Sequence, residues 1–140
     1  MLLKPDPIAV EARQRVIYGD TDQMGVVYYA NYLRFFELGR MEYFRARGGR
    51  YSELEAAGFA LPVVHVEADY RASAKYEDVV VIRTTVTELR RASFGFSYEI
   101  CREADGAVLC TGSTVHACLG KTGRPTSLPP PLAKLLAESP

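Results

Sequence analysis

The sequence has 140 residues, a length that removes roughly 68% of the unfolded chain's surface from water when it folds around one core. Its 17 basic and 17 acidic residues balance, which excludes a global charge that would draw it to nucleic acid or an anionic membrane. No apolar run approaches the roughly 18 residues of a membrane span, and Pro5 and Pro7 interrupt the opening stretch before a signal-peptide core forms. We therefore expect one domain over residues 1–140, located in the cytoplasm.

The three cysteines lack the paired spacings of a zinc site or a disulfide framework, which agrees with a reducing compartment. As a two-residue hairpin turn, Asp105-Gly106 places Cys101 directly opposite Cys110 in two neighbouring strands. Such a pair could oxidise in air. Because disulfides are uncommon in the cytosol, we expect reduced thiols in the cell.

A first strand is predicted over Glu11–Gly19 and leads into an acidic loop. From about Ala30 to Arg47 the pattern becomes helical, and Gly48 and Gly49 supply the stop. The large apolar residues of this segment share an arc of about 180° on the helix: Tyr29, Tyr32, Leu33, Phe35, Phe36, Tyr43, Phe44 and Ala46. Such a wide arc indicates a helix that is deeply embedded against a sheet.

The rest of the chain is rich in strand signals. A short helix is predicted over Tyr51–Ala57, and four strands rich in Val, Thr, Tyr and Phe follow within residues 59–72, 78–89, 91–104 and 107–120. A proline-rich tail over residues 127–140 has room for one more short helix. One strand, one long helix and about four antiparallel strands predict an α+β fold, in which a sheet of about five strands curls around one central helix.

The loop before the long helix carries two aspartates. If the helix begins near Tyr29–Asn31, its first N–H groups have no partner within the helix and present a partial positive charge that can bind an oxyanion. Asp22 lies one tight turn upstream, and Gly25 lets the backbone fold back. A carboxylate beside an oxyanion site is the minimum equipment for hydrolysing an acyl group. The alternative is that Asp20 or Asp22 only caps the turn.

The segment YGDTDQMGVVYYANYLRFFELGRMEYFR resembles the signature of hot-dog-fold thioesterases of the 4-hydroxybenzoyl-CoA thioesterase family. That family includes the acyl-CoA thioester hydrolases associated with the Tol-Pal system. The later stretches DYRASAKYEDVV and LRRASFGFSYEI follow the order of the same family, so that the resemblance covers nearly the whole chain. It implies a hot-dog fold and hydrolysis of an acyl- or aryl-CoA to the free acid and coenzyme A.

The resemblance also implies roles for individual residues. Asp22, the second aspartate of the family's D-x-D-x-x-G motif, would be the general base or the nucleophile, with Asp20 as its supporting neighbour and Gly25 as the motif glycine. The N–H of Tyr29 at the helix start would polarise the thioester carbonyl. By resemblance, the Tol-Pal-associated enzymes have histidine at this position, whereas a tyrosine looks more like the aryl-CoA enzymes. The identity of the preferred acyl group therefore stays open. Ser73 stands where the family often has proline.

Coenzyme A carries phosphates, so that basic residues are expected near the site. Arg90 and Arg91, followed by Ser93, resemble the arginine pair that holds the nucleotide phosphates in the family. The weaker candidates for this role are Arg71, Lys75, Lys121 and Arg124. For each of these cations the alternative is an ordinary solvated surface position. The resemblance implies no metal and no separate cofactor, because coenzyme A is part of the substrate.

Both histidines of the chain fall within predicted strands. His65 shares a strand face with Glu67 and Asp69, which suggests metal ligands, but an exposed or interface strand explains the pattern better. His116 lies on the strand face opposite its two apolar neighbours, and we expect it to be exposed or at a subunit contact.

Two rival functions remain open. A hot-dog dehydratase or hydratase would need a catalytic histidine near the helix start, where this sequence has none. A non-catalytic acyl-CoA-binding or scaffold protein would not need Asp22 and Gly25. A single sheet also leaves the backbone groups of its edge strands unpaired. By resemblance, the family joins two such sheets into one, with the catalytic site at the subunit boundary. We therefore expect a homodimer as the least active unit and a homotetramer in solution.

Overall fold

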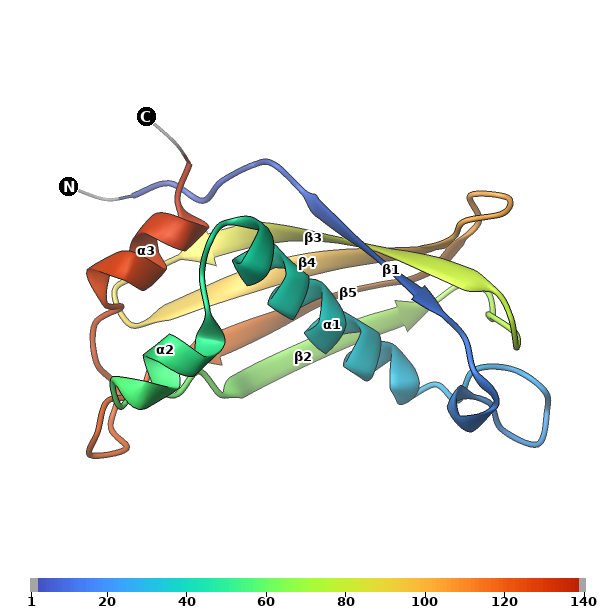
Figure 1. Cartoon of the computed structure of the whole chain (residues 1–140), viewed down its shortest axis with the longest axis horizontal. Helices are drawn as coiled ribbons and strands as arrows, with labels where there is room; N and C mark the ends of the chain where they lie inside the picture. The colour runs from blue at the N-terminus through green and yellow to red at the C-terminus, as the bar shows by residue number, and fades with distance from the viewer. Residues whose placement is uncertain (1–2, 139–140) are drawn as a thin grey trace.

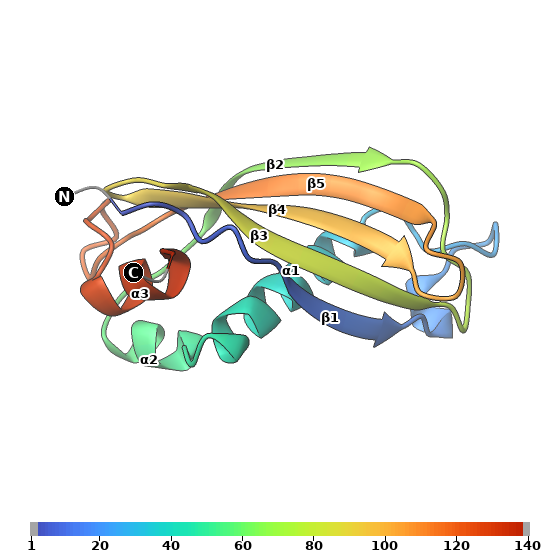
Figure 2. The same cartoon turned by 90° about the horizontal axis from the view of Figure 1, so that it is seen from above.

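The structure, a computed structural model, describes residues 3–138. Five strands form one antiparallel sheet in the order β1-β3-β4-β5-β2: β1 (Val10–Arg15), β2 (Val63–Tyr70), β3 (Val79–Leu89), β4 (Ser93–Arg102) and β5 (Val108–Ala117). Helix α1 (Asn31–Ala46) crosses one face of this sheet, and α2 (Tyr51–Ala56) and α3 (Pro130–Leu136) lie on the same side (Figures 1 and 2). The prediction of an α+β fold, with about five antiparallel strands around one long helix, is confirmed.

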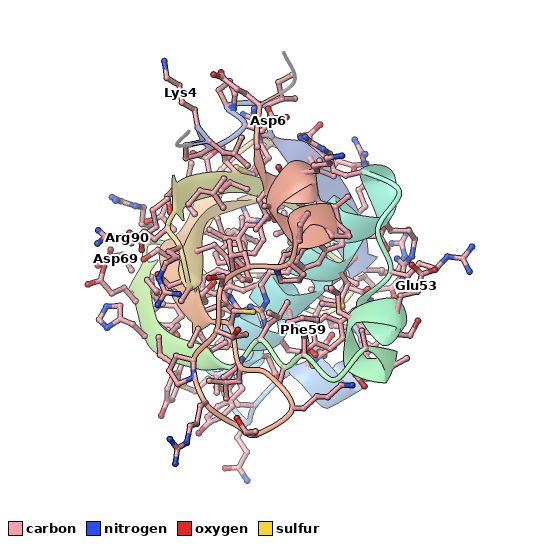
Figure 3. All side chains as sticks on the ribbon, turned by 90° about the vertical axis from the view of Figure 1, so that its left-hand side faces the viewer. Lys4, Asp6, Glu53, Phe59, Asp69 and Arg90 are labelled. Atoms are coloured by element: carbon pink, nitrogen blue, oxygen red, sulfur yellow. The ribbon has the colours of Figure 1, made fainter. Side chains whose placement is uncertain are left out.

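Aromatic side chains and one glycine hold α1 against the sheet. Phe35, Phe36 and Tyr43 are fully buried, and the sheet curves around the helix that carries them (Figure 3). A Cβ at Gly39 would lie 2.4 Å from Thr84 Oγ1. Because no side chain fits there, glycine is what lets the helix backbone approach β3 this closely.

The boundaries of α1 agree with the predicted helix to within one residue at each end. Gly48 has a φ of 81°, and the N–H of Gly49 donates to the carbonyl of Phe44 at 2.8 Å, which ends the helix as predicted. The predicted apolar arc is too wide at its edges. Leu33 is 38% exposed, and Tyr29 precedes the helix and is 61% exposed, so that the first turn is open to solvent.

The first strand is shorter than predicted. It ends at Arg15, and a short 3-10 turn, η1 (Tyr18–Asp20), follows it. The Asp20 carboxylate accepts the N–H of Ile17 at 3.0 Å. Because this side-chain acceptor takes a donor that a strand ladder would use, the extended segment turns away from the sheet before the acidic loop.

The predicted pairing of Cys101 with Cys110 is wrong. The N–H of Arg102 donates to the carbonyl of Ala107 at 2.8 Å, so that residues 103–106 form a four-residue loop in place of a two-residue turn. Cys101 pairs with Val108, and a bulge then sets Ile100 opposite Cys110. Beyond the bulge, the observed register differs from the predicted one by one residue. Each residue of β4 therefore shares its face of the sheet with the β5 side chains that the prediction had placed on the other face.

The two short helices close one end of the fold. α3 follows Pro129, has Pro130 at its first position, and buries Leu132 and Leu136. α2 follows the end of α1 after a short connection and has no fully buried side chain. None of the helices within residues 3–138 is long and apolar enough to cross a membrane.

Candidate active site

The acidic loop before α1 is a tight hairpin that main-chain hydrogen bonds close. The N–H of Asp22 donates to the carbonyl of Val26 (2.9 Å), and the N–H of Gly25 donates back to the carbonyl of Asp22 (3.0 Å). Gly25 has a φ of 77°, a left-handed conformation that glycine adopts without steric cost. One oxygen of the Asp22 carboxylate accepts the N–H of Met24 at 2.9 Å. Its other oxygen has no hydrogen-bond partner among residues 3–138 and is free for chemistry.

Asp20 ties this loop to the start of α1. The residue is 3% exposed, and its carboxylate accepts the N–H of Ile17 (3.0 Å) and pairs with the guanidinium of Arg34. Its carbonyl accepts the N–H of Tyr28 (2.9 Å) and the side-chain amide of Asn31 (2.8 Å). These four contacts fix the backbone between the acidic loop and the first turn of the helix.

The helix start presents unpaired N–H groups. Among the hydrogen bonds of residues 3–138, none has the N–H of Tyr29 or Ala30 as its donor, whereas the N–H of Asn31 donates to the carbonyl of Tyr28 at 2.9 Å. The hydroxyl of Tyr70 donates to the carbonyl of Tyr29 at 3.0 Å and so holds this backbone segment from its other side. The result is a pair of N–H donors with partial positive charge at an accessible helix end.

Aromatic rings surround this helix end. The ring centroids of Tyr28 and Tyr29 are 4.7 Å apart, and Tyr70 contacts Tyr29 edge-on at 6.1 Å. The neighbouring Tyr29, followed by the smaller effects of desolvation and of the Asp22 charge, raises the pKa of Tyr28. The main-chain hydrogen bonds from Tyr28 to Asp20 and from Asp22 to Val26 hold the acidic loop against the helix start. The acidic loop that carries Asp22 and Gly25 therefore lies directly before the first turn of α1 (Figure 1).

Two of the predicted cations lie at the same end of the molecule. Lys75 forms a short antiparallel bridge with Val26 of the acidic loop. Arg71 directly follows β2, and its N–H donates to the carbonyl of Leu109 at 2.9 Å. Both side chains are exposed, and the backbone of Lys75 borders the acidic loop.

The other predicted cations lie at the far end of the sheet. Arg90 and Arg91 form the turn between β3 and β4, and Ser93 begins β4. Arg90 is paired with Glu88 (3.0 Å), and Arg91 donates to the hydroxyl of Ser127 (2.9 Å). Lys121 and Arg124 are exposed in the loop after β5. Because β4 is ten residues long, it separates the turn that carries Arg90 and Arg91 from the Asp22 end by roughly 30 Å within one chain.

The prediction that His116 is exposed is wrong. His116 is 3% exposed and faces α1, because the bulge in the β4–β5 pair sets it opposite buried Phe94. Its ring stacks on Phe94 with the centroids 5.1 Å apart, and burial lowers the pKa of its imidazole to about 4. His65 is exposed as expected, with Nε2 3.1 Å from Glu67 Oε1. No cluster of three or more His, Cys, Asp or Glu side chains suited to a metal occurs within residues 3–138.

A buried polar chain next to His116 was not predicted from the sequence. Arg40 of α1 donates to the hydroxyl of Tyr98 (3.3 Å), which lies 2.6 Å from the hydroxyl of Thr114, and Thr114 lies 2.9 Å from His116 Nε2. Thr114 and His116 stand at alternate positions of β5, which is a sequence signal for polar side chains on one face of the sheet. The sequence prediction placed the apolar neighbours Val115 and Ala117 inward instead, and the alternation of a strand then turned Thr114 and His116 outward.

Comparisons with known proteins agree with this fold. Residues 16–136 match the thioesterase-like superfamily. The acyl-CoA thioesterase YbgC of Haemophilus influenzae is 36% identical over 118 residues, which cover 82% of this chain and 85% of that protein. The crystal structure of protein TT1821 from Thermus thermophilus superposes with a TM-score of 0.85 at 34% identity, and covers 90% of this chain and 95% of that chain.

A further solved structure holds a ligand. It is an aspartate-to-asparagine variant of 4-hydroxybenzoyl-CoA thioesterase complexed with 4-hydroxybenzoyl-CoA, with a TM-score of 0.82, 25% identity, and coverage of 92% of this chain and 99% of that chain. The match to the family model spans most of the sequence, and the fold agrees with those of these relatives. The chain therefore belongs to the thioesterase-like superfamily of hot-dog proteins.

Proposed function

We propose that this protein hydrolyses the thioester bond of an acyl- or aryl-CoA, with Asp22 as the general base or nucleophile and the N–H of Tyr29 as the oxyanion donor. The observation that carries the proposal is that the acidic loop with the partly free Asp22 carboxylate leads directly into a helix end with unpaired N–H groups. Relatives named as acyl-CoA thioesterases and as a 4-hydroxybenzoyl-CoA thioesterase support the substrate class.

The chemistry needs few groups, because a thioester carbonyl is weakly stabilised by resonance and coenzyme A leaves as a thiolate. As a general base, Asp22 takes a proton from water while the hydroxyl adds to the carbonyl carbon. As a nucleophile, it adds to that carbon itself and gives a mixed anhydride that water then opens. In both routes the carbonyl oxygen becomes negative and accepts the N–H of Tyr29. One such donor contributes about 3–4 kcal/mol to the transition state.

The edge of the sheet supports a dimeric enzyme. β2 is a strand at the sheet edge with one partner, β5, and Val63, Val64 and Val66 are all exposed on it. Pairing of β2 with a second copy of itself would satisfy this edge and cover the valines. A two-fold axis between antiparallel edge strands brings the Arg90–Ser93 end of one copy to the Asp22 end of the other. Arg90, Arg91 and Ser93 would then contact coenzyme A bound at the neighbouring Asp22, with Lys75 and Arg71 beside it.

Replacement of Asp22 by asparagine tests the catalytic role. We expect the Asp22→Asn variant to remain folded and to bind coenzyme A, with kcat reduced at least about a hundredfold. The measurement is thiol release from a panel of acyl- and aryl-CoA thioesters. Asp105→Asn is the matched control, since it changes another loop aspartate and is expected to keep normal turnover. Normal turnover in Asp22→Asn would contradict the mechanism, whereas tight binding without turnover in the wild type would indicate a binding protein.

A second experiment tests the shared site. The double variant Arg90→Ala, Arg91→Ala is expected to raise the KM for acyl-CoA and to change the KM much less for thioesters truncated to the pantetheine arm, because only the full coenzyme carries the nucleotide phosphates. Light scattering of the wild type at micromolar concentration is expected to give a dimer or tetramer. A fully active monomer of 15.5 kDa would refute the shared site.

A further inference from the structure

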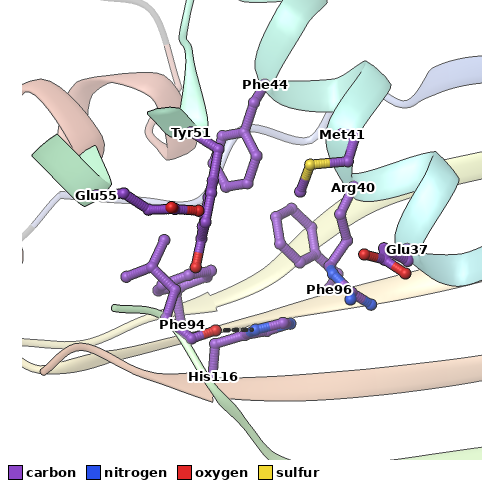
Figure 4. A pocket seen from close by; sticks show the side chains of 10 residues that line it. Glu37, Arg40, Met41, Phe44, Tyr51, Glu55, Phe94, Phe96 and His116 are labelled. Atoms are coloured by element: carbon purple, nitrogen blue, oxygen red, sulfur yellow. Dashed lines mark hydrogen bonds between the residues drawn. The ribbon is translucent and has the colours of Figure 1, made fainter. Parts of the chain in front are cut away.

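Two neighbouring cavities lie along α1, beyond its first turn. The first, of about 450 Å³, lies between the first half of α1 and β2, and Leu33, Val63 and Val66 line it. The second, of about 330 Å³, lies under α2, and the rings of Phe44, Phe94 and Phe96 line it (Figure 4). Both cavities share two wall residues, Glu37 and Arg40. Arg40 therefore stands in the wall between the two cavities, where a group that extends along α1 from a carbonyl at Tyr29 would reach it.

The buried polar chain fixes the position of Arg40. The carbonyl of Leu61 can only accept, so that His116 Nδ1, 3.1 Å away, carries the proton. Since burial keeps this imidazole neutral, Nε2 accepts from the hydroxyl of Thr114. Thr114 in turn accepts from Tyr98, and Tyr98 accepts from Arg40. Each hydroxyl in this series of hydrogen bonds donates its proton once and accepts once. Arg40 is therefore the donor at the open end of the series.

Arg40 lacks the carboxylate that a partly buried guanidinium ordinarily has. None of the ion pairs among residues 3–138 includes Arg40, and its one hydrogen bond to a side chain goes to the neutral hydroxyl of Tyr98. Glu37 and Glu55 also line the second cavity, but both side chains are exposed. A guanidinium has five N–H donors in a planar fork that fits a carboxylate. Most of these donors are therefore available to a ligand in a cavity that has several aromatic rings in its wall.

We infer that Arg40 binds a carboxylate at the far end of the acyl group, which makes ω-carboxyacyl-CoA thioesters of medium length the preferred substrates. This inference rests on the proposed function. Arg40 follows Tyr29 by eleven residues, or roughly 16 Å along a helix axis, and its side chain leans back toward the helix start. A plain alkyl end would displace water from the guanidinium and supply no acceptor, whereas a carboxylate forms charge-assisted hydrogen bonds.

The test compares octanoyl-CoA with suberoyl-CoA, which has the same carbon chain but ends in a carboxylate. In the wild type, kcat/KM is expected to be at least about tenfold higher for suberoyl-CoA. Arg40→Gln is expected to abolish this preference, and Arg40→Lys to retain part of it. Arg45→Gln is the matched control, because Arg45 lies on the same helix, is exposed and pairs with Glu42. A wild-type ratio near one, or an unchanged ratio in Arg40→Gln, would overturn the inference.

A binding measurement separates this inference from the proposed function. Free suberate is titrated into the wild type and into Arg40→Gln, and chemical-shift changes of the cavity residues are followed by NMR. Saturable binding to the wild type that Arg40→Gln weakens at least about tenfold would support the carboxylate site even if no thioester were turned over. Turnover of octanoyl-CoA without a preference for suberoyl-CoA and without suberate binding would defeat the carboxylate site and leave the thioesterase standing.

Discussion

The two ends of α1 differ in how their polar groups are satisfied. At the C-terminal end, the guanidinium of Arg47 pairs with buried Asp6 and donates to the carbonyl of Ala137 at 3.0 Å, so that the end of the helix is tied to both chain termini. At the N-terminal end, the N–H groups of Tyr29 and Ala30 have no acceptor among residues 3–138. The closed end anchors the helix, and the open end leaves two donors unpaired at the place where the proposed reaction needs them.

This contrast implies that stability and catalysis can be altered separately. Substitutions at the closed end are expected to lower the free energy of unfolding with little effect on the reaction of the molecules that stay folded. Substitutions at the open end are expected to slow the reaction and to change the free energy of unfolding little, because few buried contacts depend on the acidic loop. The following four predictions test this separation, from the largest expected effect to the smallest.

Asp6→Asn is expected to lower the free energy of unfolding by about 3–5 kcal/mol, because it leaves the largely buried Arg47 without its counter-ion. Burial alone would raise the pKa of Asp6, but its hydrogen bond from Ile8 and its pairing with Arg47 lower it. Urea unfolding measures the effect. Glu42→Gln, which removes an exposed partner of Arg45, is the control and is expected to cost less than about 1 kcal/mol. Equal losses in the two variants would contradict the closed-end assignment.

The buried His116 is expected to make the protein sensitive to mild acid. Burial lowers its pKa from 6.5 to about 4. Between pH 6.5 and about pH 4, this histidine is therefore protonated in the unfolded chain but neutral in the folded chain. Stability due to this group is complete above pH 6.5 and is lost at about 1.4 kcal/mol per pH unit as the pH falls. Urea unfolding at pH 7 and pH 5 measures the loss. In His116→Gln the difference between these two pH values is expected to shrink, and an unchanged difference would assign the acid sensitivity to other groups.

Gly25→Ala is expected to act at the open end. No atom lies within 4 Å of a Cβ built at Gly25, so that the substitution meets no clash, but its φ of 77° costs a residue with a side chain about 1–2 kcal/mol. The loop is expected to relax, moving Asp22 and lowering kcat several-fold, while the melting temperature changes little. Gly123→Ala is the control, since Gly123 has the same φ of 77° in the loop after β5. A matching loss of kcat in the control would remove the link to the acidic loop.

The smallest effect is expected for Tyr70→Phe, which removes only the hydroxyl that donates to the carbonyl of Tyr29. Loss of this hydrogen bond is worth about 1 kcal/mol, so that kcat is expected to fall about fivefold with KM nearly unchanged. A structural role would instead alter KM and stability together. Tyr76→Phe is the control, because the hydroxyl of Tyr76 has no hydrogen-bond partner within residues 3–138.

The sequence was sufficient for the features that local patterns encode. The helical period from Ala30 to Arg47 and the glycines that follow it predict α1 to within one residue at each end, because a wide apolar face and a left-handed stop are local signals. The acidic loop was also recognisable, since Asp22 and Gly25 stand at fixed spacing before the helix. The roles of Asp22 and Tyr29 remain predictions.

The features that the sequence did not reveal depend on register and on distance. The longer hairpin loop gave Cys101 the partner Val108 in place of Cys110, and one bulged residue in β5 then set His116 opposite Phe94. The turn residues of a hairpin do not reveal either feature. The separation of Arg90 and Arg91 from the acidic loop depends on strand length and on sheet order. Arg40 was not singled out from the sequence, because only the folded sheet brings Tyr98 and Thr114 next to it.

The tyrosines around the open end of α1 provide an intrinsic fluorescence signal for ligand binding there. The chain has nine tyrosines and no tryptophan, so that its intrinsic fluorescence is tyrosine emission that no indole masks. Five of these tyrosines are exposed around the acidic loop and the helix start: Tyr18, Tyr28, Tyr29, Tyr70 and Tyr76. Because an adenine or an aryl group that stacks on such rings quenches their emission, unlabelled wild-type protein can report ligand binding at this end directly, at concentrations low enough to follow assembly in the same cuvette.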